Sequence, residues 1–494
     1  MSVGVTILGY ILLSIYVLSM VYITIYCLMQ VHLLFHYQWF NIKVADGEKD
    51  KLKELPFVTI QLPIFNEKYV VERLIDNILK MDYPKDRFEV HILDDSTDET
   101  VEITAKKVQE YRSLGYNIEQ ITRVNRQGFK AGALRDAMHQ AKGEFIAIFD
   151  ADFLPRPDFL KKTLPYFYNE KVGVVQTRWE HINKDYSLLT RLQAMQLNVH
   201  FTVEQKGRNA ANYLLQFNGT AGVWRRETID DAGGWEADTL TEDLDLSYRA
   251  QMKGWDIVFR EDLGSPAELP AEMNGLKSQQ FRWMKGGAET AKKMLPSVWS
   301  SNLKLPQKIH ATTHLLASSV FLSIFLMGFL SVPIMFFINP LGIEPSKFGY
   351  FYISFFAVIT VYFVANVTRS WNEGNILWRA IKFFLIFPIF LALSMGLSLH
   401  NSVAVIQGFL GKKTPFVRTP KFGIKNITDT FKKKNYLSSK ISWVTIFEGI
   451  MAIYFLASIL YAFQSSNKTF LYLHLLLFIG FGSTFFYTIK HSRS

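Results

Sequence analysis

The sequence predicts an α/β domain with a doubly wound, mostly parallel sheet, inserted between transmembrane α-helices. β-rich runs alternate with helical patterns between residues 57 and 149, as in sheets whose strands are joined by crossover helices. Residues 1–35 contain no Lys, Arg, Asp or Glu, and long apolar segments return after residue 310. The chain between them has an ordinary globular composition and about the size of one domain.

The first part of this globular domain sets out the predicted sheet. Strands are expected at residues 57–62, 88–93, 117–121 and 144–149, and helices at about 69–81, 98–114 and 126–142. Ligands bind beyond the carboxyl ends of the strands in such sheets. We therefore expect a binding site where the second and fourth strands end, at Asp94 and Asp150.

The apolar segments are candidates for membrane helices, at residues 1–35, 311–338, 349–367, 376–400, 441–463 and 469–489. We interpret residues 376–400 as an interfacial helix, because Pro388 lies in its middle and Arg379 and Lys382 flank its start. Five spanning helices then remain, and every basic stretch falls on one side of the membrane. The excess of basic residues in cytoplasmic loops places the globular domain and the C-terminus inside and the N-terminus outside.

The predicted organisation therefore has five parts. They are an N-terminal transmembrane helix (1–35), a cytoplasmic globular domain with membrane-interface helices (36–310), a transmembrane hairpin (311–369), an interfacial helix region with a basic loop (370–440) and a C-terminal transmembrane hairpin (441–494).

Charge and cysteine content exclude some classes of protein. Much of the net charge of +10 is local to residues 411–440, which is typical of a cytoplasmic loop between membrane segments and does not indicate nucleic-acid binding. The single cysteine, Cys27, permits no disulfide within one chain, and no Cys/His cluster has zinc spacing.

An acidic pair, Asp150-Ala151-Asp152, follows the fourth predicted strand. Alternation along the backbone puts both carboxylates on one side, where they can approach one hard cation. Mg²⁺ and Mn²⁺ prefer oxygen ligands, and Mg²⁺ is commonly shared between carboxylates and substrate phosphates. A simple turn at the strand end is the alternative. Asp94-Asp95 could likewise bind a nucleotide, and the alternative there is a helix start, capped by Ser96 and Thr97.

The triplet Thr241-Glu242-Asp243 opens a helical stretch. Asp243 could act as a general base on an acceptor hydroxyl, with Glu242 orienting its neighbours. The alternative is structural, because Thr241 as a helix cap with two acidic residues in the first turn is a complete explanation by itself.

A second motif, Gln279-Gln280-Phe281-Arg282-Trp283, lies on a predicted helix just before the membrane region. Arginine can bind a diphosphate through two hydrogen bonds, and an indole face is a platform for a sugar ring. Aromatic and basic residues are also ordinary membrane anchors at this position. Lys130, in a glycine-punctuated segment, and Phe217-Asn218-Gly219-Thr220 are weaker candidates for contacts with a donor and an acceptor, and the second could be a turn.

In this order the motifs resemble those of processive, membrane-embedded family 2 glycosyltransferases, in the cellulose synthase superfamily. The likeness runs from about residue 55 to 290 and is greatest to plant cellulose-synthase-like A and C proteins, through the words KAGAL, AIFDADF, FNGTAGVWR, AGGW and ELP. It implies a GT-A-type catalytic domain. Phe416-Val417-Arg418-Thr419-Pro420-Lys421 resembles the gating-loop pattern Phe-x-Val-Thr-x-Lys of bacterial cellulose synthase, with Arg418 in place of the valine.

The resemblance also implies roles for the motif residues. The donor would be bound by Asp94, Asp95, Lys130, Asp150, Gln279, Arg282 and Thr419. Asp150 and Asp152 would hold Mg²⁺ or Mn²⁺, and Asp243 would be the catalytic base. The acceptor would contact Phe217, Asn218, Gly219, Thr220, Glu242 and Trp283.

The implied activity is the inverting transfer of hexose from UDP-glucose or GDP-mannose to a growing β-linked, β-1,4 polysaccharide. Product export through the helices would involve membrane lipid and accessory export subunits. The membrane would be a bacterial inner membrane or, in a eukaryote, the Golgi or plasma membrane. Two alternatives remain open: a non-processive transferase that adds one sugar to a lipid, and a transporter or receptor with a cytoplasmic nucleotide-binding module.

Overall fold

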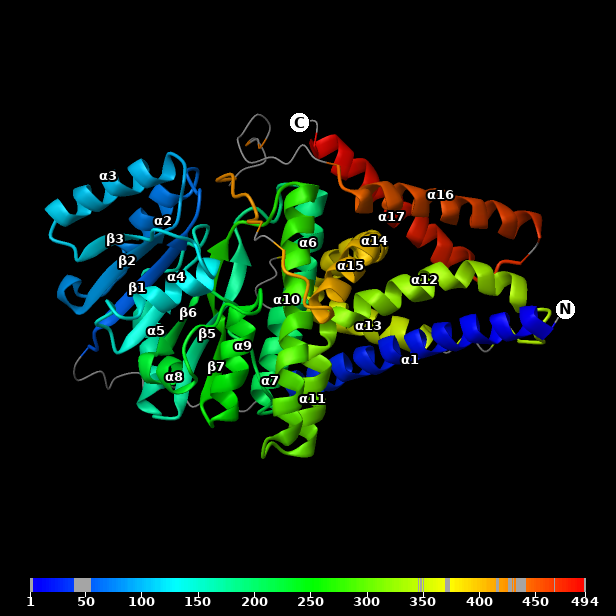
Figure 1. Ribbon diagram of the computed structural model, residues 1–494, viewed down its shortest axis with the longest axis horizontal. Coiled ribbons are helices and arrows are strands. Elements are labelled where there is room, and N and C mark those ends of the chain that lie inside the picture. Colours follow the sequence, from blue (N-terminus) through cyan, green and yellow to red (C-terminus); the bar gives the residue numbers. More distant parts are fainter. Residues whose placement is uncertain are drawn as a thin grey trace.

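The computed structural model describes residues 3–39, 55–344, 351–368, 374–414, 417–424, 441–465 and 467–492, together with residues 346, 349, 429 and 431. A globular sheet domain occupies one half of the molecule, and long apolar helices occupy the other half (Figure 1). Helices α6 (Leu188–Val199), α10 (Met273–Ser300) and α11 (Leu305–Leu315) stand between the two halves.

The globular domain contains a seven-stranded sheet in the order β3-β2-β1-β4-β6-β5-β7. Its strands are β1 (Val58–Ile64), β2 (Phe88–Asp94), β3 (Ile118–Thr122), β4 (Phe145–Ile148), β5 (Val172–His181), β6 (Gly222–Arg225) and β7 (Asp256–Ala267). Only β6 is antiparallel to its neighbours, and the other pairings are parallel. The prediction of a mostly parallel sheet is confirmed, and its four expected strands are β1 to β4.

Both faces of the sheet are buried, which explains why β4 is apolar at every position. Phe145 and Ala147 belong to the core cluster on one face, whereas Ile146 and Ile148 belong to the cluster on the other. The covering helices include α2 (Val71–Ile78), α3 (Thr100–Ser113), α4 (Phe129–Ala137), α5 (Phe159–Thr163), α8 (Arg226–Asp231) and α9 (Glu242–Met252). This arrangement leaves the carboxyl edge of β1, β2 and β4 for the site.

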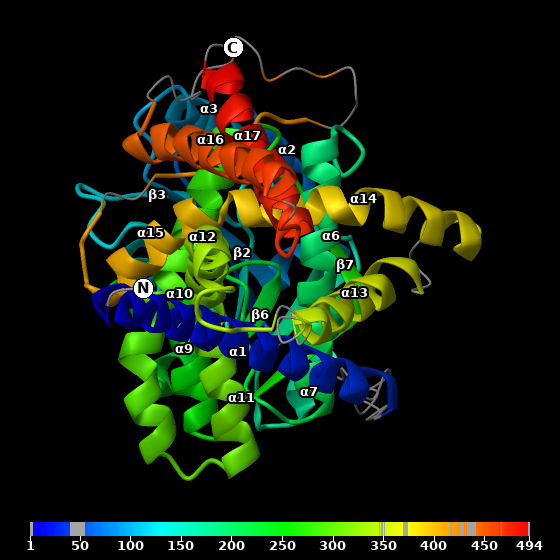
Figure 2. The ribbon, with the colours of Figure 1, turned by 90° about the vertical axis from the view of Figure 1, so that its right-hand side faces the viewer.

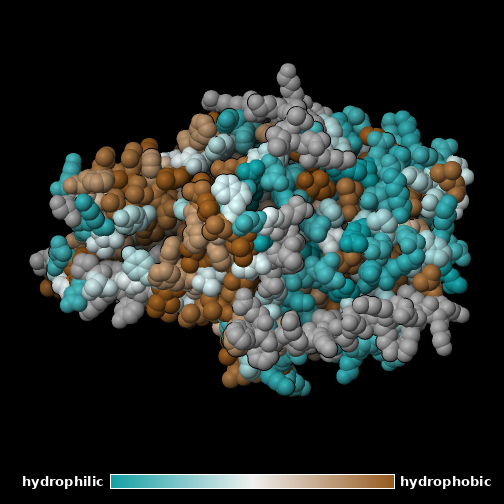
Figure 3. Space-filling model, turned by 180° about the vertical axis from the view of Figure 1, so that it is seen from behind, coloured by the Kyte–Doolittle hydropathy of each residue, from teal (hydrophilic) through white to brown (hydrophobic). Residues whose placement is uncertain are grey.

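The apolar half consists of helices α1 (Val3–Trp39), α12 (Val320–Phe337), α13 (Phe351–Val367), α14 (Ile376–Gly396), α15 (Ser398–Phe409), α16 (Trp443–Gln464) and α17 (Leu471–Ser492). Among the described residues, five helices are long and apolar enough to cross a membrane: α1, α12 with its preceding turn, α14, α16 and α17. Hydrophobic residues dominate the surface of this half, and hydrophilic residues dominate the other (Figure 3). The chain is a multi-pass membrane protein.

Helix α14 differs from the other long apolar helices in direction. Its length and composition would allow it to span, whereas α13, which the sequence predicts to span, is shorter. Figure 1 shows α14 nearly end-on and α12 lengthwise, and Figure 2 shows the reverse. The crosswise orientation favours the interfacial interpretation of α14, and the domain boundaries and membrane orientation remain predictions.

Candidate active site

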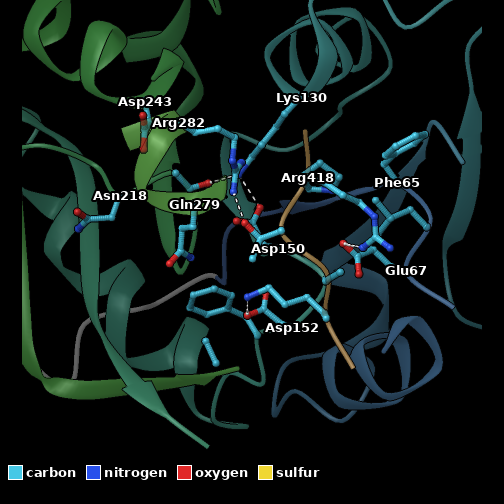
Figure 4. A pocket seen from close by; sticks show the side chains of 18 of the residues that line it. Phe65, Glu67, Lys130, Asp150, Asp152, Asn218, Asp243, Gln279, Arg282 and Arg418 are labelled. Carbon is cyan, nitrogen blue, oxygen red and sulfur yellow. Dashed lines mark hydrogen bonds and ion pairs between the residues drawn. The ribbon is translucent and has the colours of Figure 1, made fainter. Parts of the chain in front are cut away.

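A cavity of about 210 Å³ lies at the carboxyl edge of the sheet, between the sheet, α10 and the segment 417–421. It brings together twelve residues that the sequence predicts for the site: Asp95, Lys130, Asp150, Asp152, Asn218, Gly219, Glu242, Asp243, Gln279, Arg282, Trp283 and Thr419. We call it the donor cavity (Figure 4). Three predicted residues, Asp94, Phe217 and Thr220, are not in its lining.

Asp94, the last residue of β2, and Asp95, which follows it, have different environments. Asp94 is 2% exposed, and its carboxylate accepts hydrogen bonds from the Ser96 backbone and from Gln120. Asp95 lies in the cavity lining and pairs with Arg123 at 2.5 Å. Asp94 therefore shapes the turn, while Asp95 is the member of the pair that a ligand can reach.

Asp150 and Asp152 are each held by a lysine from another part of the chain. Lys130 Nζ lies 2.5 Å from Asp150 Oδ1, and Lys421 Nζ lies 2.7 Å from Asp152 Oδ2 (Figure 4). Among the described residues, the second oxygen of each carboxylate has no hydrogen-bond partner. Two oxygen donors separated by one small residue fit a hard divalent cation.

Lys130 is positioned by the first turn of α4. Gly128, with φ of +75°, allows the chain to enter that helix in a conformation that other residues rarely adopt. Lys130 Nζ donates to Asp150 and, at 2.9 Å, to the carbonyl oxygen of Gly219. Burial lowers the pKa of Lys130, but the charges of Asp150 and Glu242 outweigh it and raise the pKa overall. The residue therefore stays cationic and can bind an anionic ligand.

Asp243 lies in the first turn of α9 with its carboxylate in the cavity. Burial and the neighbouring Glu242 raise the pKa of Asp243 to about 7, against the opposing effect of Lys130. A pKa near neutrality suits a general base. Gly219 adopts a φ of +79°, and a Cβ there would lie 3.0 Å from Asp243 Oδ2. A side chain at this position would crowd the Asp243 carboxylate.

Helix α9 is held directly against α10. The hydroxyl of Thr241 lies 3.0 Å from that of Thr290 and makes no cap hydrogen bond, so Thr241 occupies the cap position without capping the helix through its side chain. The acidic residues Glu242 and Asp243 do lie in the first turn. Gly286 permits the close approach, because a Cβ there would lie 2.6 Å from Thr241 Cγ2. This contact holds the Asp243 and Arg282 helices in a defined relation.

Helix α10 presents Gln279, Arg282 and Trp283 to the cavity. Its first turn is capped by Glu272, which accepts from the backbone of Asn274 at 2.5 Å and from that of Gly275. The buried pair Lys277–Glu448, at 2.8 Å, ties the helix to α16. The cavity-facing residues are therefore carried by an anchored helix.

The segment 417–421 lies over the donor cavity. Arg282 donates to the hydroxyl of Thr419 at 2.9 Å, and Arg418 pairs with Glu67 at 3.0 Å. Burial raises the pKa of Glu67 to about 8, against the charge of Arg418. Phe416, the first residue of the gating-type pattern, lies outside the described residues.

The sequence analysis gave no site role to several charged residues that line this cavity, among them Glu67, Glu268, Arg418 and Lys421. Glu67 follows β1, so its place at the carboxyl edge was an available signal. Lys421 occupies the last position of the gating-type pattern, and its contact with Asp152 spans 269 residues of sequence. No local pattern predicts such a pairing.

A second cavity, of about 300 Å³, adjoins the first and shares Asn218, Asp243 and Trp283 with it. We call it the deep cavity, because it continues between α1, α11 and α13 in the apolar half. Phe217 and Thr220 are not among the residues that line it. Phe217 is fully buried in the core, and the Thr220 hydroxyl accepts from the backbone of Asp150 at 2.8 Å.

Within the described residues, one group of three acidic side chains is close enough to share a metal ion: Glu236, Asp238 and Asp245. Lys293 lies among them, at 2.5 to 3.1 Å from each. Arg249 also pairs with Glu236 and Asp245, so the cluster is a salt-bridge network.

Comparison with known proteins identifies relatives of this chain. Residues 56–286 match a family described as "Glycosyltransferase like family 2". The chain is 35% identical over 397 residues to "Glucomannan 4-beta-mannosyltransferase 1" of Oryza sativa subsp. japonica, covering 77% of this chain and 73% of that protein. It is also 35% identical over 399 residues to "Glucomannan 4-beta-mannosyltransferase 9" of Arabidopsis thaliana, covering 76% and 70%.

A solved structure has the same fold at low sequence identity. A mannosyltransferase from Pyrobaculum calidifontis, in complex with GDP-Man and Mn²⁺, superposes with a TM-score of 0.56 and 18% identity, covering 82% of this chain and 100% of that one. This likeness confirms the expected GT-A-type fold of the catalytic domain.

Proposed function

The chain belongs to glycosyltransferase family 2, in the cellulose-synthase-like group that includes the glucomannan 4-beta-mannosyltransferases, and on that premise we propose that it builds a β-1,4-linked mannan from GDP-mannose. It is a hexosyltransferase, and the relatives support mannose over glucose as the sugar. One observation carries the proposal: the charged donor cavity opens, at Asp243 and Trp283, into a deep cavity that leads into the apolar half.

Asp243 is the proposed base of the transfer. It takes the proton from an acceptor hydroxyl, whose oxygen attacks the anomeric carbon of the donor. The bond from that carbon to the diphosphate oxygen breaks, and the configuration at the carbon inverts. Lys130 and Arg282, both lining the cavity, bind the departing GDP.

Asp150 and Asp152 are the proposed ligands of Mg²⁺ or Mn²⁺. Their oxygen donors match the preference of these ions, which when bound would neutralise charge on the diphosphate. Lys421 occupies one oxygen of Asp152. We infer that this lysine must leave, or share its oxygen, when the donor binds.

The deep cavity is the proposed path of the product. It is lined by Trp283 at its entrance and by residues of α1 and α13 farther in. A polymer that enters it moves away from the donor and toward the membrane helices. This geometry supports a processive, exporting enzyme over a transferase that adds one sugar to a lipid. We propose that the catalytic domain lies on the cytoplasmic side, where nucleotide sugars are.

The test uses the full-length protein in lipid nanodiscs with labelled GDP-mannose or UDP-glucose, with Mg²⁺, Mn²⁺ or EDTA. We expect GDP release and a polymer that endo-β-1,4-mannanase digests, lost with EDTA and in Asp243→Asn. Polymer from UDP-glucose alone would contradict the proposed donor. A lipid bearing one sugar would contradict the proposed polymer, and turnover with neither donor would contradict the transferase itself.

A further inference from the structure

The wall of the deep cavity contains an unusual helical turn. Helix α6 passes into a π-helical turn, His200–Gln205, which continues into α7 (Lys206–Ala210). Such turns are uncommon in proteins, and those that occur are often found at functional sites. This one places both His200 and Glu204 in the cavity lining.

Hydrogen bonds connect His200 to both Glu204 and Asn218. Its Nδ1 lies 2.8 Å from Glu204 Oε2, and its Nε2 lies 2.8 Å from Asn218 Oδ1. The same Asn218 oxygen accepts from Gln216 Nε2 at 2.9 Å. Each ring nitrogen therefore faces an oxygen atom, and His200 bridges the Glu204 carboxylate and the Asn218 amide oxygen.

Glu204 is held in its ionised form. Burial would raise its pKa, but the hydrogen bond and charge of His200 lower the pKa to about 2. Its Oε1 accepts from Gln30 at 2.8 Å and from the Tyr26 hydroxyl at 3.2 Å, both on α1. The ion pair is thus fastened to the N-terminal helix.

This hydrogen-bond network ends at Asn218, which lies where the donor cavity and the deep cavity meet. It is 8% exposed and lines both cavities, and its Nδ2 donor has no partner in the structure. Its backbone nitrogen donates to Gln176 at 2.9 Å, so the residue is fixed on two sides. An unmet buried donor is costly unless a ligand supplies the acceptor.

We propose that the Asn218 amide donates to an oxygen of the acceptor sugar, and that the His200–Glu204 ion pair is the positioning unit that aims it. This inference rests on the proposed function. The acceptor sugar would lie against the Trp283 indole, with one hydroxyl at Asp243 and a second oxygen at Asn218. The His200 ring holds the amide oxygen and thereby turns the Nδ2 donor toward the sugar.

The test measures donor and acceptor kinetics separately in nanodiscs, with labelled GDP-mannose and soluble β-1,4-mannotetraose. The variants are Asn218→Ala, His200→Gln, Glu204→Gln and the double variant Asn218→Ala/His200→Gln. His310→Gln is the matched control, because His310 is a buried histidine of α11 that hydrogen-bonds His32 and is not in the lining of the deep cavity.

We expect each single variant to raise the KM for mannotetraose by about three- to ten-fold, the effect of one lost hydrogen bond, with the KM for GDP-mannose unchanged. The double variant should be no worse than Asn218→Ala, because the pair acts through the amide. The control should match wild type.

Three outcomes would overturn the inference. They are an unchanged acceptor KM in active variants, additive effects in the double variant, and equal losses in donor and acceptor use. GDP binding by each variant reports folding, and Glu204→Gln preserves shape if His200→Gln does not fold. Failure of the wild type to transfer mannose would instead contradict the proposed function.

Discussion

The two cavities differ in charge far more than in size. The donor cavity is lined by carboxylates and cations from the sheet edge, α10 and the segment 417–421, among them Asp150, Lys130 and Arg282. The deep cavity has aromatic, amide and aliphatic walls, and its few ionisable groups include the paired His200 and Glu204. Only one of the two is built for a highly charged ligand.

This difference matches the two substrates of a sugar transfer. A nucleoside diphosphate is bound through several fixed charges, whereas a neutral saccharide is bound through an indole face and oriented hydrogen bonds. Asp243 and Trp283 line both cavities and therefore stand where the chemistries meet. Variants on each side should have separable effects on donor and acceptor.

The largest effect is expected at Asp243, the proposed base, which lines both cavities. Asp243→Asn keeps the shape of the side chain but cannot take the acceptor proton, so the turnover number should fall by about 100- to 10,000-fold. GDP binding, measured by calorimetry, should stay near wild type because the diphosphate contacts lie elsewhere. Equal losses of turnover and GDP affinity would contradict the separation of the two cavities.

A smaller effect is expected on the donor side alone. Arg282→Ala removes a cavity cation that also holds Thr419, and kcat/KM for GDP-mannose should fall by about 100- to 1,000-fold. Arg282→Lys, the matched control, should restore part of the loss because it keeps the charge. An effect confined to the acceptor KM would place this residue in the wrong cavity.

The pH dependence of the turnover number tests the role of Asp243, which lies where the two cavities meet. Because the pKa of Asp243 is raised to about 7, its carboxylate is protonated below that value and inactive as a base. The turnover number should be about ten-fold lower at pH 6 than on its plateau at alkaline pH. The residual activity of Asp243→Asn should lose this dependence. A wild-type rate that is flat between pH 6 and 8 would rule out the assignment.

The smallest effect is expected from the aromatic wall. Trp283→Ala should raise the acceptor KM by about three- to ten-fold, the usual contribution of an aromatic stack. Trp283→Phe should recover most of it. Measuring KM for mannotetraose and for GDP-mannose in parallel would show which cavity this residue serves. A change in the donor KM alone would reverse the expectation.

The sequence predicts the sheet and the donor side well because both follow local rules. β4 is a continuous apolar run that ends at an acidic pair, and parallel strands bring their carboxyl ends to one edge. Lys130, Asp150, Asp243 and Arg282 come from four elements but meet there, as the order of the motifs implied.

The acceptor side was harder to predict. His200 and Glu204 belong to no motif, and their partners on α1 are 174 and 178 residues away from Glu204. Phe217 and Thr220, in contrast, lie within a recognisable motif but do not line the donor cavity. Phe217 is buried in the core, and Thr220 accepts a hydrogen bond from the Asp150 backbone. A motif fixes neighbours along the chain, not which of them faces the ligand.

The anchoring of α10 has a consequence for biosynthesis. The backbone of Met273 donates to His491 at 3.0 Å, across 218 residues of sequence, and Lys277 pairs with Glu448. The helix that carries Arg282 and Trp283 thus receives its last fastenings only when the final hairpin has been translated and inserted. A nascent chain therefore lacks these two contacts of α10 until α16 and α17 have been translated.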